Sequence, residues 1–119
     1  MEMNENIIVD KSKNFAYEIV DMYKLLYQEK KEFVMSKQIL RSGTSIAANI
    51  AESQHAESKA DFYHKLNISL KEANETLLWL DLLQHGKYIN DKEYQSMKDD
   101  CIEIIKILVA ITKQQKIIS

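Results

Sequence analysis

Apolar residues recur at intervals of three and four along most of the chain, the spacing that places them on one face of an α-helix. The first such segment spans about residues 10–29, and Asp10 or Ser12 is expected to cap its start. After the charged connection QEKKE, a second apolar periodicity covers about residues 33–56. The pattern therefore predicts two helices joined by a short polar loop.

A capping signal marks the start of a third helix. Ser58 and Asp61 have the spacing at which a serine oxygen accepts a hydrogen bond from the third backbone N–H, with an acid in the first turn. This helix is predicted to reach about His85, and Gly86 suits the left-handed position that follows many helix ends.

The fourth helix repeats the same signal. Asn90 and Glu93 form a capping pair, and the apolar pattern after them continues to about Lys116. Four helices with short connections must run antiparallel to their neighbours, so the predicted fold is all-α, an antiparallel up-down-up-down four-helix bundle. The 119 residues suit one domain, residues 1–119, and the chain has no proline and only two glycines.

The last two helices carry more apolar surface than one core-facing stripe requires. At about 100° per residue the apolar side chains of the fourth helix cover roughly 220° of its circumference. They are Ile102, Ile104, Ile105, Ile107, Leu108, Val109 and Ile111. The third helix has a similar run, Leu77, Leu78, Trp79, Leu80, Leu82 and Leu83. Large exposed apolar patches mark interfaces, so the pattern predicts a homo-oligomer that uses the outer faces of both helices. The alternative is that these side chains close the end of the bundle beneath its loops.

The stretch RSGTSIAANI, residues 41–50, places weak helix formers in the middle of the second helix. Gly43 and Ala47 lie on its apolar side, one turn apart, and form a notch between larger residues. Small side chains allow helix backbones to approach closely, which offsets the roughly 1 kcal/mol that a mid-helix glycine costs. We therefore interpret Gly43 and Ala47 as a close-packing notch.

A polar stripe runs beside the notch, and a possible counterpart occurs on the third helix. The stripe comprises Gln38, Ser45, Asn49 and Glu52, and the counterpart comprises Ser69, Glu72 and Thr76. If the two face each other, their groups satisfy one another and align the second helix with the third. A ligand or partner site and plain exposure to solvent are the alternatives.

Three segments of these helices resemble one bacterial protein family. They are QILRSGTSIAANIAE at 38–52, SKADF at 58–62 and ISLKEANETLLWL at 68–80. Together they are similar to the four-helix-bundle family of 23S rRNA-intervening sequence proteins, over about residue 7 to the end. That family is similar to the accessory protein of diversity-generating retroelements, a pentameric ring that associates with a reverse transcriptase and binds nucleic acid. The resemblance implies a bundle, a ring-like pentamer and a role with RNA or a ribonucleoprotein.

Charge gives little support for nucleic-acid binding. The chain carries 16 Lys and Arg residues against 18 Asp and Glu, a formal net charge of −2, without a concentrated basic run. The candidate contacts are Lys37, Arg41, Lys59 and Lys65, which are expected to gather near the second and third helices. No apolar run approaches the 18 residues of a membrane span, and the N-terminus lacks a secretory signal, so we expect a cytoplasmic protein without a membrane partner.

Metal-dependent catalysis is the competing hypothesis. Glu52 with His55 has the Glu-x-x-His spacing of di-iron bundles, and Asp61 with His64 repeats an acid-x-x-His spacing. Glu18 and Glu103 are further candidate ligands. Both motifs fall near one helix connection rather than in mid-bundle, and no phosphate-binding glycine loop, nucleophile elbow or zinc spacing is present. The sequence therefore favours a noncatalytic protein without a cofactor that binds a macromolecular partner, either a protein or an RNA-containing complex.

Overall fold

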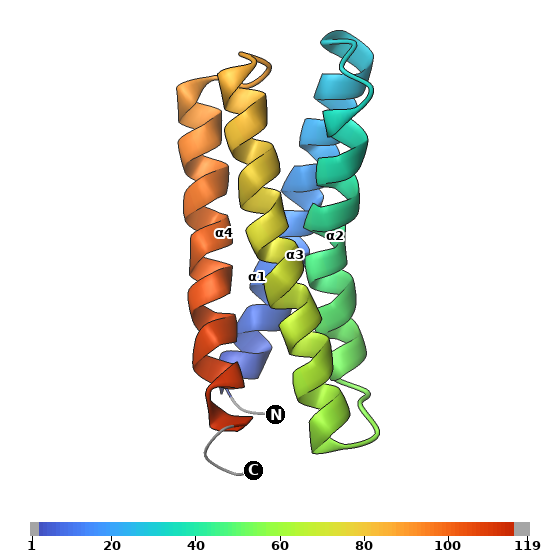
Figure 1. The fold of residues 1–119 in the computed structure, drawn as a ribbon, viewed down its shortest axis with the longest axis vertical. Coiled ribbons are helices and arrows are strands. Elements are labelled where there is room, and N and C mark those ends of the chain that lie inside the picture. The colour runs from blue at the N-terminus through green and yellow to red at the C-terminus, as the bar shows by residue number, and fades with distance from the viewer. Residues whose placement is uncertain (1–2, 116–119) are drawn as a thin grey trace.

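The computed structural model describes residues 3–115, and their side chains from Asn6 on. This part of the chain forms four long helices and no strand: α1 (Met3–Lys24), α2 (Met35–Ser53), α3 (Lys59–His85) and α4 (Asp91–Thr112). A five-residue π-helix, η1 (Leu25–Glu29), extends α1. The bundle measures 47 × 22 × 19 Å, and its helices alternate in direction along the long axis (Figure 1). The predicted antiparallel four-helix bundle is confirmed.

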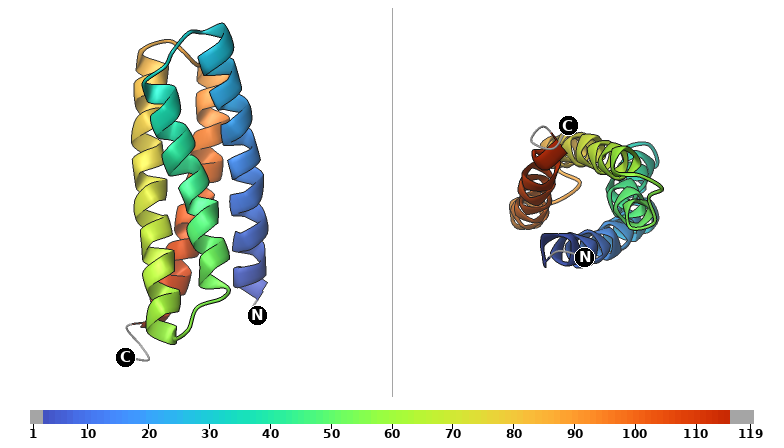
Figure 2. Two further views of the ribbon diagram at one scale, coloured as in Figure 1. Left: turned by 90° about the vertical axis from the view of Figure 1, so that its right-hand side faces the viewer. Right: turned by 90° about the horizontal axis from the view of Figure 1, so that it is seen from below.

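The order of the helices around the bundle follows the chain. In the view along the long axis, α1, α2, α3 and α4 are neighbours in that order, and α4 comes back beside α1 (Figure 2). Apolar side chains from all four helices fill the centre. The largest fully buried ones are Ile8, Phe15, Ile19, Leu26, Ile39, Ile46, Ile50, Leu66, Leu80, Leu83, Ile104 and Leu108.

The first helix begins seven residues before the predicted position, so neither Asp10 nor Ser12 caps it. Ser12 is buried within α1, and its hydroxyl donates to the carbonyl oxygen of Val9 at 3.1 Å. Because this bond satisfies the hydroxyl within the helix, a serine fits a core-facing position between Ile8 and Phe15. A polar residue in the apolar stripe concealed the first two turns of the helix.

The connection from α1 to α2 depends on Glu32. Its buried carboxylate accepts hydrogen bonds from the backbone N–H groups of Ser36 at 2.7 Å and Val34 at 3.3 Å. The Ser36 hydroxyl donates to the Glu32 carbonyl oxygen at 2.7 Å. The two bonds to the carboxylate satisfy two of the N–H groups at the start of α2, which begins at Met35 and ends at Ser53, inside the predicted limits.

The capping serine and asparagine act as predicted. The Ser58 side chain accepts from the Asp61 N–H at 3.1 Å, and Asn90 and Glu93 form a complete capping box at the start of α4. The predicted role of Gly86 is wrong, because its φ is −75° and the left-handed residue is Lys87, with φ 63°.

The end of α3 explains the position of the left-handed residue. The Tyr88 N–H donates to the Leu83 oxygen at 3.0 Å, and the Lys87 N–H donates to the Gln84 oxygen at 2.9 Å. This is the Schellman pattern, in which the residue that donates the shorter-range bond, here Lys87, takes the left-handed conformation. The left-handed residue therefore lies one position after the glycine.

The predicted end of α4, at about Lys116, lies outside the described residues. In the described part of the chain, α4 ends at Thr112.

Most of the wide apolar arc of α4 is covered by its neighbours. Ile104, Leu108 and Ile111 are buried, while the flanking residues, Ile102, Ile105, Ile107 and Val109, are half-buried. On α3, Leu78 and Leu82 remain exposed, at 52% and 39%. The exposed apolar surface of this pair is therefore concentrated on α3. None of the described helices has the length and apolar character to cross a membrane.

Candidate functional site

The notch on α2 receives a side chain from α1. Gly43 is buried, and a Cβ placed on it would lie 2.7 Å from Cγ1, 2.8 Å from Cδ1 and 2.9 Å from Cγ2 of Ile19. These separations are too short for carbon atoms, so only glycine allows this approach without a shift of Ile19. Ala47, one turn later, is half-buried. The notch therefore sets the spacing of α1 and α2.

Buried hydroxyl groups join α2 to α3. The Ser69 hydroxyl donates to the carbonyl oxygen of Ile46 at 2.8 Å, across the two helices. Thr76 Oγ1 lies 2.9 Å from Ser42 Oγ and 2.8 Å from the Glu72 carbonyl oxygen. Ser42, Ser69 and Thr76 each have a relative exposure of 0%. Because these hydroxyls are buried from water, sliding one helix along the other would leave them without hydrogen-bond partners. The hydrogen bonds therefore align α2 with α3.

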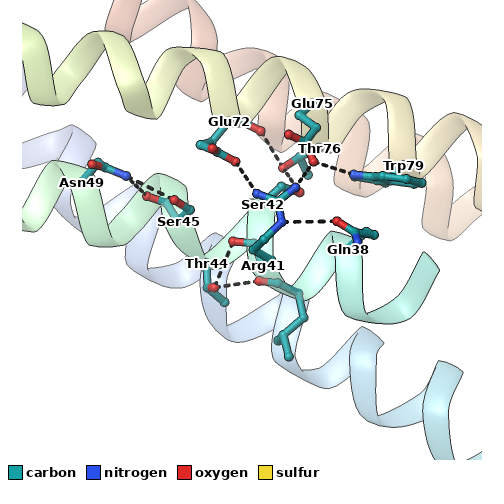
Figure 3. Close-up of polar contacts among 11 residues, drawn as sticks. Gln38, Arg41, Ser42, Thr44, Ser45, Asn49, Glu72, Glu75, Thr76 and Trp79 are labelled. Atoms are coloured by element: carbon teal, nitrogen blue, oxygen red, sulfur yellow. Dashed lines mark hydrogen bonds and ion pairs between the residues drawn. The ribbon is translucent and has the colours of Figure 1, made fainter. Parts of the chain in front are cut away.

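Arg41 extends this contact to the surface. Its guanidinium pairs with Glu72 at 3.1 Å and with Glu75, both on α3, and its Nε donates to Gln38 at 3.2 Å (Figure 3). The indole N–H of Trp79 donates to the same Glu75 carboxylate at 2.9 Å. One guanidinium thus links two turns of α3 to α2, with a planar set of donors suited to carboxylates.

The predicted polar stripes face each other only in part. The α3 residues Ser69, Glu72 and Thr76 do contact α2, but their partners are Arg41, Ser42 and the backbone of Ile46 rather than the predicted stripe. Sequence reasoning missed Ser42. Its position, three residues after Ile39 and four before Ile46, marks it as core-facing.

The α2 stripe satisfies its own groups or pairs locally. Asn49 donates to the Ser45 carbonyl oxygen at 2.9 Å and to the Ser45 hydroxyl at 3.1 Å, both within α2 (Figure 3). Gln38 accepts from Arg41, and Glu52 pairs with Lys65 on α3 at 3.6 Å. The expectation that Ser45 and Asn49 bond to α3 is wrong, because the short amide reaches the preceding turn of its own helix first.

The four candidate nucleic-acid contacts do not gather on one surface. Arg41 and Lys65 form ion pairs with acids, and the Lys37 ammonium lies 5.8 Å from the centre of the Tyr27 ring. Lys59 is exposed at the first residue of α3. Because α2 and α3 are antiparallel, Lys37 and Lys59, each in a first turn, lie at opposite ends of the bundle (Figure 1). All four residues thus lie on α2 and α3, as expected, but they do not form one cluster.

The candidate metal ligands are also separated. Within the described part of the chain, no group of three or more His, Cys, Asp or Glu side chains is placed to hold a metal ion. Glu52 pairs with Lys65, and Glu103 pairs with Lys11. Asp61 accepts from the Glu57 N–H at 3.3 Å, while His55 and His64 are exposed, and the Glu18 carboxylate faces Asp100 on α4. The residues of the metal hypothesis are thus held in other contacts or point to solvent.

The single cysteine is a core residue. Cys101 has a relative exposure of 0%, and its thiol donates to the Ala73 carbonyl oxygen at 3.4 Å. Burial, with a smaller contribution from the Asp100 charge, raises the pKa of the Cys101 thiol to about 12. A thiol with this pKa stays protonated at neutral pH, so it is a poor nucleophile and metal ligand.

The described residues define a four-helix bundle in which a glycine notch spaces α1 from α2, and buried hydroxyls with one arginine align α2 with α3. The chain belongs to the 23S rRNA-intervening sequence protein family, whose profile matches residues 4–110. The resemblance found in the sequence is thereby confirmed.

A solved structure supports the same assignment. A protein of unknown function from the S23 ribosomal protein family of Bacteroides thetaiotaomicron VPI-5482 is similar to this chain, with 58% sequence identity and a TM-score of 0.92. The match covers 93% of this chain and 99% of that protein. A comparison with curated proteins finds no match.

Proposed function

We propose that this protein is a noncatalytic, homo-oligomeric four-helix-bundle scaffold that binds a macromolecular partner, either a protein or an RNA-containing complex. The observation that carries the proposal is the exposure of Leu78 and Leu82 on the outer face of α3, at 52% and 39%. They lie one turn apart on a long helix and form one exposed apolar strip on it. Contacts between copies would remove this surface from water.

The contacts of the reactive side chains agree with a noncatalytic role. Arg41 forms ion pairs with two carboxylates, and Glu52 forms one with Lys65. Burial raises the pKa of the Cys101 thiol and keeps it protonated. Within residues 6–115 these groups serve packing and alignment. We propose that the protein acts in the cytoplasm, and that its assembly is a ring of about five copies, a closed arrangement that a head-to-tail contact can produce.

Light scattering coupled to size-exclusion chromatography tests the assembly. We expect a mass near five times the 13.9 kDa chain mass. The double variant Leu78→Glu/Leu82→Glu should reduce it to the monomer mass, because two carboxylates would be buried without partners in an apolar contact. The matched control is Val34→Glu, which also charges an exposed apolar position, 71% exposed, ahead of α2. A monomeric wild-type protein would overturn the oligomer.

The choice between partners is tested with structured RNA. The net charge of −2 and the dispersed lysines favour a protein partner over RNA. Filter binding at low and moderate salt should then show no retention of RNA at micromolar protein. Retention at low salt that falls steeply as salt rises would instead support the RNA-containing partner, since phosphate contacts release counterions.

A further inference from the structure

A groove runs along the side of the bundle where the first and last helices meet. It consists of two clefts of about 550 and 170 Å³ that share Glu18 as a lining residue. The larger lies between Met22 and Leu25 on one side and Met97 of α4 on the other. The smaller continues toward Phe15. No loop joins α1 directly to α4.

The floor of the larger cleft is apolar and adaptable. Met22 and Met97 have exposures of only 7% and 6%, so their side chains form the base of the cleft rather than its edge. Leu25, the first residue of η1, also lines this cleft. Unbranched thioether side chains adjust to apolar groups of different shapes, which makes such floors suitable for helical partners.

The rim of the groove is acidic. Glu18 and Asp21 line it from α1, and Asp100 faces Glu18 from α4. Among the described residues, none of these three carboxylates forms an ion pair with a lysine or arginine. Partial burial raises the pKa of Glu18, and the nearby charges of Asp100 and Asp21 add to the rise.

The other charged groups of the groove only partly offset this field. Lys11 pairs with Glu103 at the far end of the smaller cleft. Lys92 lies on the rim of the larger cleft together with Glu93, whose carboxylate accepts from the Asn90 N–H. A positive charge placed between α1 and α4 would therefore reduce the repulsion among Glu18, Asp21 and Asp100.

We propose that the groove between α1 and α4 binds a basic amphipathic helix of a partner protein. An apolar stripe of that helix would cover the methionine floor, and its lysine or arginine residues would pair with Glu18, Asp21 and Asp100. From Lys11 to Leu25 the groove follows α1 for about 21 Å, the length of a helix of roughly 14 residues. The proposal rests on the proposed binding role and names the surface and the chemistry of the partner.

The proposed groove and the proposed contact between copies use different sides of the molecule. Leu78 and Leu82 are on α3, whereas the groove lies between α1 and α4. A bundle in a ring can therefore keep its groove open. Binding of the partner helix and assembly can be measured separately for this reason.

The probe is a labelled amphipathic peptide of about 14 leucine and lysine residues, matched to the groove length and followed by fluorescence anisotropy at low salt. A scrambled peptide of the same composition and a leucine–glutamate peptide serve as ligand controls. We expect binding of the first peptide only, weakening as salt rises. In selectively labelled protein, the methyl resonances of Met22 and Met97 should shift, while that of Met35 on α2 should not.

The decisive variant is Glu18→Gln/Asp100→Asn, which we expect to weaken binding at least about tenfold. It removes a repulsion, so the fold is kept, as circular dichroism would verify. The matched control, Glu29→Gln/Glu57→Gln, removes two exposed charges from outside the groove and should bind as the wild type does. Equal weakening in both variants, or unmoved methionine resonances, would overturn the proposal.

Two further outcomes separate this proposal from the proposed function. If Met22 and Met97 shift with protein concentration in the absence of peptide, a second copy occupies the groove, and the partner helix is wrong. A stable oligomer that binds no peptide overturns the groove alone. A monomer that binds the peptide in the groove supports the groove and overturns the oligomer.

Discussion

Gly43 of α2 lies directly against Ile19 of α1, and a Cβ at position 43 would be 2.7 Å from the Ile19 Cγ1 atom. Ile19 has no exposed surface, so it is enclosed by the core around it. The closeness of α1 and α2 thus depends on one missing methyl group. Gly43 thus weakens α2 as an isolated helix but allows α1 and α2 to pack closely.

Gly43→Ala should therefore destabilise the protein, although alanine is the better helix former. Overpacking a filled core costs about 1–3 kcal/mol, which exceeds the roughly 1 kcal/mol gained in helix propensity. We expect a net loss of about 1–2 kcal/mol in the free energy of unfolding, measured with urea. Ile19→Ala should cost less in the Gly43→Ala background than in the wild type, because it makes room for the new methyl group. An alanine variant as stable as the wild type would contradict this account.

The buried hydroxyl pair of Ser42 and Thr76 can be tested by a double-mutant cycle. Thr76→Val preserves shape but leaves the Ser42 hydroxyl without its partner, so we expect a loss of about 1–2 kcal/mol. Ser42→Ala should cost less, about 0.5–1 kcal/mol, since Thr76 retains its bond to the Glu72 carbonyl oxygen. The double variant should cost clearly less than the sum of the two. Additive losses would show that the pair does not couple α2 to α3.

Glu18→Gln should stabilise the protein near neutral pH. Burial and the Asp100 charge raise the pKa of Glu18 above 4.5 in the folded state, so its ionised form is disfavoured there. That penalty is present at pH values above the folded pKa and disappears as pH falls below 4.5. Because Glu18 is only partly desolvated and its side chain still contacts water, the gain is small, about 0.5 kcal/mol or less. Urea unfolding at a series of pH values should show the gain shrinking in acid.

The control for that experiment is Glu57→Gln, which changes an exposed glutamate in the loop between α2 and α3. It should alter stability little across the same range. A gain for Glu18→Gln that grew in acid, or that Glu57→Gln matched, would show that crowding with Asp100 is not the cause.

Cys101 should be inert in the folded protein. Its exposure of 0% blocks reagents, and burial raises its pKa to about 12, so the reactive thiolate is scarce at neutral pH. Alkylation by iodoacetamide, followed by mass spectrometry, should be negligible in native buffer and complete in guanidinium chloride. Rapid labelling of the native protein would show that the contact of α3 with α4 opens.

The sequence by itself determined the helical elements and the caps that depend on near neighbours. Ser58 and Asn90 each bond to a backbone N–H three residues ahead, so their roles are visible in a window of four residues. The four apolar periodicities predicted four helices for the same reason. The antiparallel order then followed from the short connections.

Only the tertiary structure decided which polar groups are partners. Asn49 has the right spacing to face α3, yet it bonds to its own preceding turn, while Ser42 meets Thr76 across the interface. The rotation of α2 about its axis settles this choice, and that rotation depends on how all four helices fill the core. Lys87 takes the left-handed position beside a glycine because the bonds that close α3 are set by where its last turn ends. Periodicity places a residue on a face, but contacts between helices decide what that face meets.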